Sequence, residues 1–197
     1  MDDVVVIGGG IIGAATAYFL SKEGRKVKVI ERDPTYKTAS FPLSLGGFRR
    51  QFFQKENILL GKFAKDFIFQ LPDILKTEKN PHPTASMVPN GYLLMFGPEH
   101  AEEQYRALKN HKACEAGTKN IKGSELTNIF PYINNEGIET ATFTDNKTEG
   151  WIDPFLFHTA LKSKAAELGA TFVQGEVKNL SEIKARTIVS AAGCWTK

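Results

Sequence analysis

The chain of 197 residues has little cysteine, histidine or tryptophan, and its charge is nearly balanced. Its two cysteines, Cys114 and Cys194, are too few and too far apart for a disulfide framework or a zinc site. We therefore expect both cysteines to be reduced thiols in an intracellular compartment. The four histidines show no metal or triad spacing, so we expect no bound metal. The 25 Lys and Arg residues exceed the 22 Asp and Glu residues by a net charge of only +3. Because the basic residues are scattered, nucleic acid is excluded as an expected partner.

Long hydrophobic runs are also scarce. Residues 4–20 carry no charge, but three consecutive glycines lie near the start of this run, where a membrane helix would not carry them. A signal peptide would begin with basic residues, whereas this chain begins with Asp2 and Asp3. We therefore expect no transmembrane segment and no transit peptide in this chain. The overall composition, 42% hydrophobic and 24% charged, is that of a globular domain.

The first thirty residues predict a strand, a glycine turn, a helix and a second strand. Residues 4–7 form a β-branched run typical of a buried parallel strand. Residues 11–22 predict a helix that ends near Gly24. Residues 27–30 predict the second strand, which Glu31 closes. Together they predict a βαβ unit.

The turn between the first strand and the helix fits the pattern G-x-G-x-x-G through Gly8, Gly10 and Gly13. In a dinucleotide site, Gly8 would permit the tight turn and Gly10 would leave space for a pyrophosphate. Gly13 would let the helix pack closely against the strand. The helix would present unpaired N–H groups at Ile11 and Ile12, with the positive end of its dipole, to the phosphates.

Glu31 would accept hydrogen bonds from ribose hydroxyls, and its carboxylate would repel a 2′-phosphate, which disfavours NADP. The glycines alone do not choose between NAD and FAD, and a glycine turn without a ligand is the alternative interpretation. A second glycine-rich loop after the second strand favours FAD, because NAD needs no such loop. The candidate cofactor contacts in this region are Arg32, Ser40, Ser44, Gly46 and Gly47.

The rest of the chain alternates helix and strand patterns. Helices are predicted over residues 57–71, ended by Pro72, and over 98–114, 124–130 and 154–168. Ser124 and Asp153 are the predicted N-caps of the last two helices. Strands are predicted over residues 91–96, 137–145, 171–174 and 187–192. His158 falls inside the last helix, where we expect a packing or surface residue.

Four landmarks resemble the FAD-dependent amino-acid and amine oxidases, the family of sarcosine, glycine and D-amino-acid oxidases. They lie at residues 8–31, 44–52, 149–154 and 189–195. In this family the stretch after Gly169 leads to a valine whose backbone meets the adenine, which implies Val177 as a contact. The turn near the end of the chain passes beside the cofactor, which implies contacts from Ala191, Ala192, Gly193 and Trp195. Covalent attachment of the flavin to Cys194 is disfavoured.

The resemblance implies an α/β fold, with a Rossmann-like FAD-binding domain of parallel sheet and helices and an inserted α+β lobe. Residues 1–50 would form the FAD-binding βαβ unit and glycine loop, 51–150 the inserted lobe, and 151–197 the return to the FAD-binding domain. The implied reaction is oxidation of a C–N bond in an amino acid or N-methylated amine, such as sarcosine or dimethylglycine. Arg49 is the one catalytic candidate, because a cation near the flavin would stabilise negative charge on the reduced ring. A solvated arginine is the alternative.

Shorter motifs resemble a mitochondrial branch of the family that includes an assembly factor of respiratory complex I. They lie at residues 31–36, 43–47, 56–58, 90–94 and 130–134. The resemblance implies a mitochondrial location, on the matrix side of the inner membrane, and complex I subunits as candidate partners. Because members of the family are longer, we expect a chain truncated at its C-terminal end. Two alternatives to an enzyme follow: a non-catalytic assembly factor that holds FAD, and an inactive truncated isoform.

Overall fold

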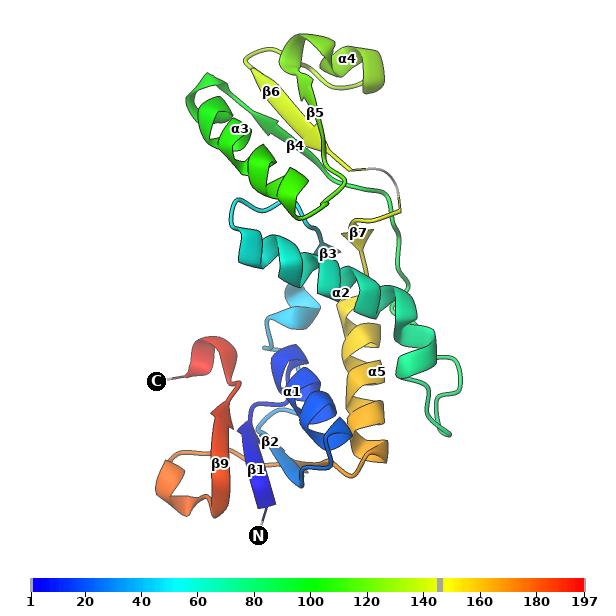
Figure 1. Ribbon diagram of the computed structural model, residues 1–197. Coiled ribbons are helices and arrows are strands. Elements are labelled where there is room, and N and C mark those ends of the chain that lie inside the picture. The colour runs from blue at the N-terminus through cyan, green and yellow to red at the C-terminus, as the bar shows by residue number, and fades with distance from the viewer. Residues whose placement is uncertain (1, 145–146, 197) are drawn as a thin grey trace. The chain divides into compact units, whose positions relative to one another are not determined.

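The computed structural model describes residues 2–144 and 147–196 (Figure 1). Asp145, the last residue of one predicted strand, lies outside these described residues. The chain divides into two compact units. The first contains Met1–Gly46, Gln70–Ser86 and Ile152–Lys197, and the second contains Gly47–Phe69 and Met87–Trp151. Residues 70–86, which the sequence assigns to the inserted lobe, thus belong to the first unit.

The first unit is built on a parallel four-stranded sheet in the order β8-β2-β1-β9. Its strands are β1 (Asp2–Ile7), β2 (Val27–Glu31), β8 (Thr171–Gln174) and β9 (Ala185–Ser190). Val4 of the central strand β1 pairs with Val27 on one side and with Thr187 on the other. The prediction of an α/β fold with a parallel sheet is therefore confirmed.

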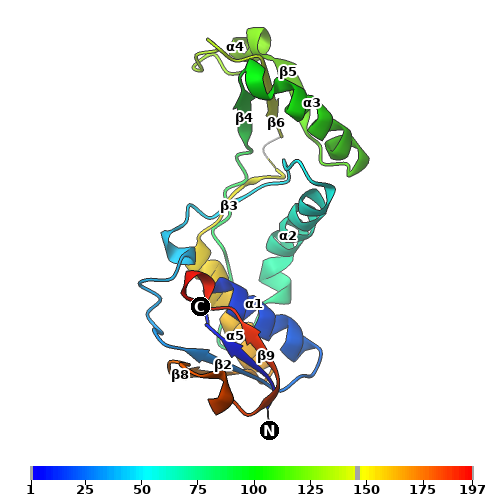
Figure 2. The ribbon, with the colours of Figure 1, turned by 90° about the vertical axis from the view of Figure 1, so that its left-hand side faces the viewer.

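Two helices cover one face of this sheet (Figures 1 and 2). They are α1 (Ile11–Lys22) and α5 (Pro154–Glu167), and they pack against each other. Both helices carry fully buried small residues, Ala14 and Ala17 in α1 and Ala165 in α5. Without large side chains at these positions, the two helices can lie close together, and α1 also contacts β1 and β2.

The helix ends follow local chemistry. α1 is followed by Gly24, whose φ of +74° suits glycine. The N-cap of α5 is confirmed as Asp153, whose carboxylate accepts the backbone N–H groups of Phe155 at 2.8 Å and Leu156 at 2.9 Å. The prediction of Ser124 as an N-cap is wrong. Ser124 lies inside the short 3-10 helix η2 (Gly123–Glu125), which leads directly into α4 (Leu126–Ile129).

The prediction that a helix ends at Pro72 is also wrong, because α2 (Lys55–Ile74) continues through this proline. Pro72 has no N–H to donate within the helix, which normally weakens a helical turn. The last turn is held instead by burial, since Leu71 and Leu75 are 1% and 0% exposed. The N–H of Leu75 also donates to the carbonyl of Leu71 at 3.0 Å. Burial of these two side chains outweighs the missing donor.

The second unit contains an antiparallel sheet in the order β4-β6-β5 and the helix α3 (Pro98–Ala113). Its strands are β4 (Leu93–Phe96), β5 (Lys119–Lys122) and β6 (Thr140–Phe143). A second, two-stranded pairing joins β3 (Gly47–Phe48) to β7 (Gly150–Trp151). β3 and β7, with two residues each, are too brief to carry a periodic signal in the sequence, and β5 has only one apolar residue, Ile121.

A buried carboxylate joins two segments of the second unit that are far apart in sequence. Glu149 is fully buried, and its oxygens accept the Arg50 backbone N–H at 2.5 Å and the Gln51 Nε2–H at 2.9 Å. The hydroxyl of Thr144 donates to the same side chain at 2.8 Å. Burying a carboxylate costs desolvation free energy unless the group is hydrogen-bonded, and here three donors bind it. Glu149 therefore links the segment that enters this unit to the segment that leaves it.

Candidate cofactor site

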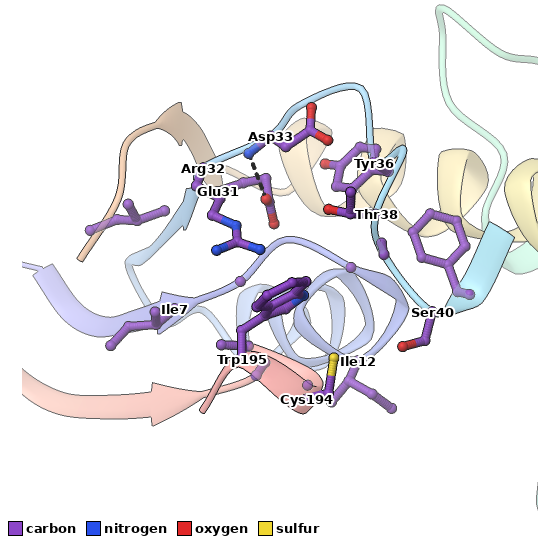
Figure 3. A pocket seen from close by; sticks show the side chains of 18 of the residues that line it. Ile7, Ile12, Glu31, Arg32, Asp33, Tyr36, Thr38, Ser40, Cys194 and Trp195 are labelled. Atoms are coloured by element: carbon purple, nitrogen blue, oxygen red, sulfur yellow. Dashed lines mark hydrogen bonds between the residues drawn. The ribbon is translucent and has the colours of Figure 1, made fainter. Parts of the chain in front are cut away.

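A pocket of about 230 Å³ lies in the first unit, beside the carboxyl ends of β1, β2 and β9 (Figure 3). Ligands of parallel α/β sheets bind at this edge, because the loops that follow the strands meet there. The pocket is lined by the glycine turn, the end of β2, the loop after it, and two segments near the C-terminal end of the chain, at residues 175–177 and 191–195.

The glycine turn after β1 is shaped by close backbone packing. Gly8 has a φ of +97°, and a Cβ there would lie 2.5 Å from the carbonyl oxygen of Ala191. A Cβ on Gly13 would lie 1.9 Å from the carbonyl oxygen of Gly8. Gly10 is different, because a Cβ there would meet only a Phe41 ring carbon at 3.8 Å. Gly8 and Gly13 are thus needed by the turn itself, whereas Gly10 leaves open space at the pocket.

The N-terminus of α1 supplies hydrogen-bond donors beside this space. The helix begins at Ile11, directly after Gly10, and no side chain caps it. The N–H groups of Ile11 and Ile12 lie in the first turn, where they have no partner within the helix. No acidic residue lies in that turn, so α1 itself does not neutralise the positive end of its dipole. The turn has the donors and the field that a phosphate group requires.

Glu31 stands at the end of β2 with both carboxylate oxygens engaged. Oε2 accepts the Gly9 N–H at 2.6 Å. Oε1 accepts the Asp33 N–H at 2.8 Å (Figure 3). Each carboxylate oxygen has a second lone pair, so Glu31 can still accept a ribose hydroxyl. The sequence indicates the ribose role but not these two backbone contacts, which fix the carboxylate against the glycine turn.

An arginine and a tryptophan stack on the pocket wall. The Cζ atom of Arg32 lies 4.1 Å from the ring centroid of Trp195, which belongs to the 3-10 helix η4 (Gly193–Trp195) (Figure 3). A guanidinium over an indole face is a favourable cation–π contact. It joins the end of β2 to the segment after β9, two parts of the chain that are far apart in sequence.

The structure brings most of the sequence-predicted contacts together and leaves others outside. Those that line the pocket are Gly8, Gly10, Ile11, Ile12, Glu31, Arg32, Ser40, Val177, Ala191, Ala192, Gly193 and Trp195. Gly13 lies behind the turn, and Ser44, Gly46 and Gly47 are not part of the lining.

Packing accounts for the residues outside the lining. The hydroxyl of Ser44 donates to the carbonyl of Phe41 at 2.8 Å, next to the 3-10 helix η1 (Phe41–Leu43). A Cβ on Gly46 would lie 2.0 Å from the carbonyl oxygen of Ile152, and one on Gly47 would lie 2.0 Å from the Tyr92 hydroxyl. These glycines are needed for close contacts inside their own units. Arg49, the catalytic candidate, belongs to the second unit, where its guanidinium lies 5.1 Å from the Phe52 ring centroid.

Several lining residues are not among the cofactor contacts predicted from the sequence. Tyr36 is 5% exposed and has a φ of +57°, an uncommon conformation for a bulky residue. Gly175 and Glu176 directly follow β8, and Cys194 lies between Gly193 and Trp195. The available signal was positional: residues that follow parallel strands gather at one edge of the sheet.

Two further findings concern the described residues as a whole. No group of three or more His, Cys, Asp or Glu side chains among them is placed to hold a metal ion. In the same part of the chain, no helix combines the length and the apolar character needed to cross a membrane.

A parallel sheet with a glycine turn at its carboxyl edge and an acidic residue closing the next strand defines the class of Rossmann-like dinucleotide-binding proteins. Within this class, the chain belongs to the FAD dependent oxidoreductase family (DAO), whose family model matches residues 3–197. The cofactor of the protein is accordingly FAD. The pocket fits the dinucleotide portion of FAD, because it combines open space at Gly10, first-turn donors and the Glu31 carboxylate.

The similar proteins have longer chains than this one. The FAD-dependent oxidoreductase domain-containing protein 1 of Xenopus laevis is 36% identical over 199 residues, which cover 97% of this chain and 39% of that protein. The protein of the same name from Bos taurus is 35% identical over 180 residues, covering 89% of this chain and 37% of its own length. The L-proline dehydrogenase from P. horikoshii superposes with a TM-score of 0.77 at 26% identity and covers 98% of this chain and 53% of its own. The chain thus spans less than half the length of these two curated relatives.

Proposed function

We propose that this chain forms the dinucleotide-binding part of an FAD-dependent oxidoreductase that oxidises a C–N bond of an amino acid or an N-methylated amine. The observation that carries the proposal is the arrangement around the glycine turn. Open space at Gly10, the uncapped N-terminus of α1 and the fixed carboxylate of Glu31 all border one pocket. This combination suits a dinucleotide with a free ribose diol.

The lining residues divide into groups with different tasks. The N–H groups of Ile11 and Ile12 would bind the pyrophosphate, and Glu31 would bind the ribose hydroxyls. The backbone of Val177 and of residues 191–193 would form the walls beside the adenine and the ring system. When bound, FAD supplies the electron acceptor for oxidation of the substrate C–N bond. The protein residues hold the cofactor in position and exclude water from it.

The likeness to L-proline dehydrogenase supports the substrate class. L-proline, the compound in the name of that enzyme, is an amino acid whose nitrogen is a secondary amine. Sarcosine and dimethylglycine share the N-alkylated amino-acid group, so they are the first compounds to test. A mitochondrial location on the matrix side of the inner membrane belongs to the same proposal, and it rests on the sequence resemblance.

A second candidate function is that of a factor that holds FAD and assists the assembly of respiratory complex I. It rests on the sequence resemblance at residues 31–36, 43–47, 56–58, 90–94 and 130–134. Both candidates need the same cofactor site. They differ in whether bound FAD turns over.

The first experiment is to incubate the purified chain with FAD, remove free cofactor by desalting, and record the visible absorption spectrum. Retained flavin absorption is expected for the wild type, and Gly10→Val is the matched control that should lose it. The absence of flavin on the wild type would contradict the proposed cofactor site. Addition of sarcosine, dimethylglycine or L-proline with an artificial electron acceptor then separates the two candidates. Turnover supports the enzyme, whereas retained FAD without turnover, together with co-purifying complex I subunits, supports the assembly factor.

A further inference from the structure

His158 makes a contact that its position in α5 does not predict. The side chain is 1% exposed, and its Nε2 atom lies 2.7 Å from the backbone carbonyl oxygen of Gly9. A carbonyl can only accept, so Nε2 carries the proton and donates it to Gly9. His158 is thus a buried residue with a defined polar partner in the glycine turn, more than the packing residue that the sequence indicates.

Two aromatic rings fix the plane of the imidazole. The ring of His158 stacks on Phe41, with centroids 4.5 Å apart and an interplanar angle of 29°. Its edge meets Tyr36, with centroids 4.5 Å apart and an angle of 68°. Phe41 and Tyr36 also line the cofactor pocket. This enclosure restricts rotation of the imidazole and keeps Nε2 directed at Gly9.

Gly9 is consequently held at both of its backbone polar groups. His158 binds its carbonyl at 2.7 Å, and the Oε2 atom of Glu31 binds its N–H at 2.6 Å. The Gly9 carbonyl and the Gly10 N–H belong to one planar trans peptide group, in which they point in opposite directions. Fixing the carbonyl toward His158 therefore directs the Gly10 N–H away from it.

We propose that His158 is a positioning residue of the cofactor site, which orients the Gly10 N–H toward the pyrophosphate of FAD by holding the Gly9 carbonyl. The proposal rests on the proposed function, because it assumes a pyrophosphate at this turn. His158 does not line the pocket, so it acts through the peptide group between Gly9 and Gly10. Its contribution is to prepare a donor before the cofactor arrives, which lowers the ordering cost of binding.

The neutral imidazole is the form that the surroundings favour. Burial lowers the pKa of His158 below its usual value, and the positive charge of Lys162 lowers it further. The hydrogen bond to Gly9 and the negative charge of Glu31 act in the opposite direction but do not prevail. The ammonium group of Lys162 is itself held by the Tyr36 hydroxyl at 3.1 Å. At neutral pH the residue therefore serves as a neutral donor through Nε2.

Two substitutions separate the hydrogen bond from the packing. His158→Gln keeps an N–H donor near the position of Nε2 but removes the aromatic ring, whereas His158→Phe keeps an aromatic ring and removes the donor. Thr159→Ala, at the next position of α5, is exposed and serves as the control for a general effect of substitution in this helix. FAD affinity is measured for each chain at neutral pH by titration of flavin fluorescence. We expect His158→Phe to bind about tenfold more weakly, the effect of one lost hydrogen bond, and His158→Gln to stay close to wild type.

A second readout does not depend on FAD. The ¹⁵N spectrum of the imidazole at neutral pH should show Nε2 as the protonated nitrogen, and the Gly10 amide signal should shift in His158→Phe but not in Thr159→Ala. Equal FAD affinity of wild type and His158→Phe, or an imidazole protonated only on Nδ1, would overturn the positioning role. A wild-type chain that shows the Nε2 tautomer but binds no FAD would instead overturn the proposed cofactor site.

Discussion

The carboxylate of Glu31 accepts the Gly9 N–H at 2.6 Å, so the end of β2 is tied directly to the turn that follows β1. The two features that a dinucleotide site needs, a glycine turn and an acidic residue on the next strand, are therefore one hydrogen-bonded structure. A change at either residue should affect both the shape of the turn and the recognition of a ribose.

Gly10→Val should remove FAD binding while leaving the fold intact. The backbone of Gly10 has a φ of −63°, which valine can adopt, and a Cβ there meets only Phe41 at 3.8 Å. The added side chain would occupy the space needed by the pyrophosphate. We expect no retained flavin after desalting and a loss of about 1 kcal/mol or less in the free energy of unfolding, the scale of an altered N-cap. Unchanged FAD retention would contradict the placement of the pyrophosphate.

Glu31→Gln should reduce both stability and FAD affinity. The carboxamide NH₂ cannot accept, so one of the two backbone N–H groups, that of Gly9 or that of Asp33, loses its partner. We expect a loss of about 1–3 kcal/mol in the free energy of unfolding, measured by urea denaturation. Glu31→Ala should further weaken FAD binding by about 1.5–3 kcal/mol through the lost charged acceptor. Glu23→Gln, at an exposed position, is the control and should change neither quantity.

The stability of the chain should fall in mildly acidic solution because of His158. Burial lowers the pKa of His158 in the folded state below the value of about 6.5 that it has when unfolded. As the pH falls below about 6.5, the unfolded state binds a proton that the folded state does not, so the free energy of unfolding decreases. The decrease ends at the lowered pKa, and above pH 6.5 His158 contributes no pH dependence.

Urea denaturation of wild type and His158→Gln across this range measures the effect. The glutamine variant should lack the part of the slope that His158 supplies. The carboxylates of Asp3, Asp33 and Glu167, whose pKa values are lowered by hydrogen bonds, titrate at lower pH and are common to both chains. Identical slopes for the two chains would show that His158 does not change its proton affinity on folding.

Glu149→Gln should destabilise the second unit without a direct effect on the cofactor pocket. Its oxygens accept three donors, from Arg50, Gln51 and Thr144, and a carboxamide leaves at least one of them unpaired. We expect a loss of about 1–3 kcal/mol in the free energy of unfolding. Under conditions where the variant is folded, FAD retention should match the wild type, since Glu149 does not line the pocket. Glu139→Gln, which is exposed, serves as the comparison, and an equal effect there would contradict the role of the buried carboxylate.

The sequence predicts the local parts of this fold well. The bounds of α1 and the capping of α5 by Asp153 follow from hydrophobic spacing and end signals within a few residues of chain. The predicted helix end at Pro72 is wrong because burial of Leu71 and Leu75, a tertiary effect, stabilises the helix beyond this proline. Gly46 and Gly47 mislead in another way, since a glycine that approaches the Ile152 backbone or the Tyr92 side chain closely looks the same in sequence as one that borders a ligand.

Contacts across long sequence separations account for what the sequence does not reveal at the site. His158 and Gly9 are separated by 149 positions, and long-range contacts such as the pairing of β2 with β8 and the packing of α5 on α1 bring them together. The stack of Arg32 on Trp195 has the same origin. Periodicity and end signals act over one or two helical turns, so they contain no information on such partners.

The exposed thiol of Cys194 provides a site for chemical labelling in the pocket. Cys194 lines the pocket and is free and exposed, whereas Cys114, the other cysteine of the chain, is free but buried. A thiol-directed alkylating reagent should therefore modify Cys194 first, and a bound cofactor should shield it. The rate of alkylation is followed by mass spectrometry with and without FAD. It would report occupancy of the site without using the optical signal of the flavin.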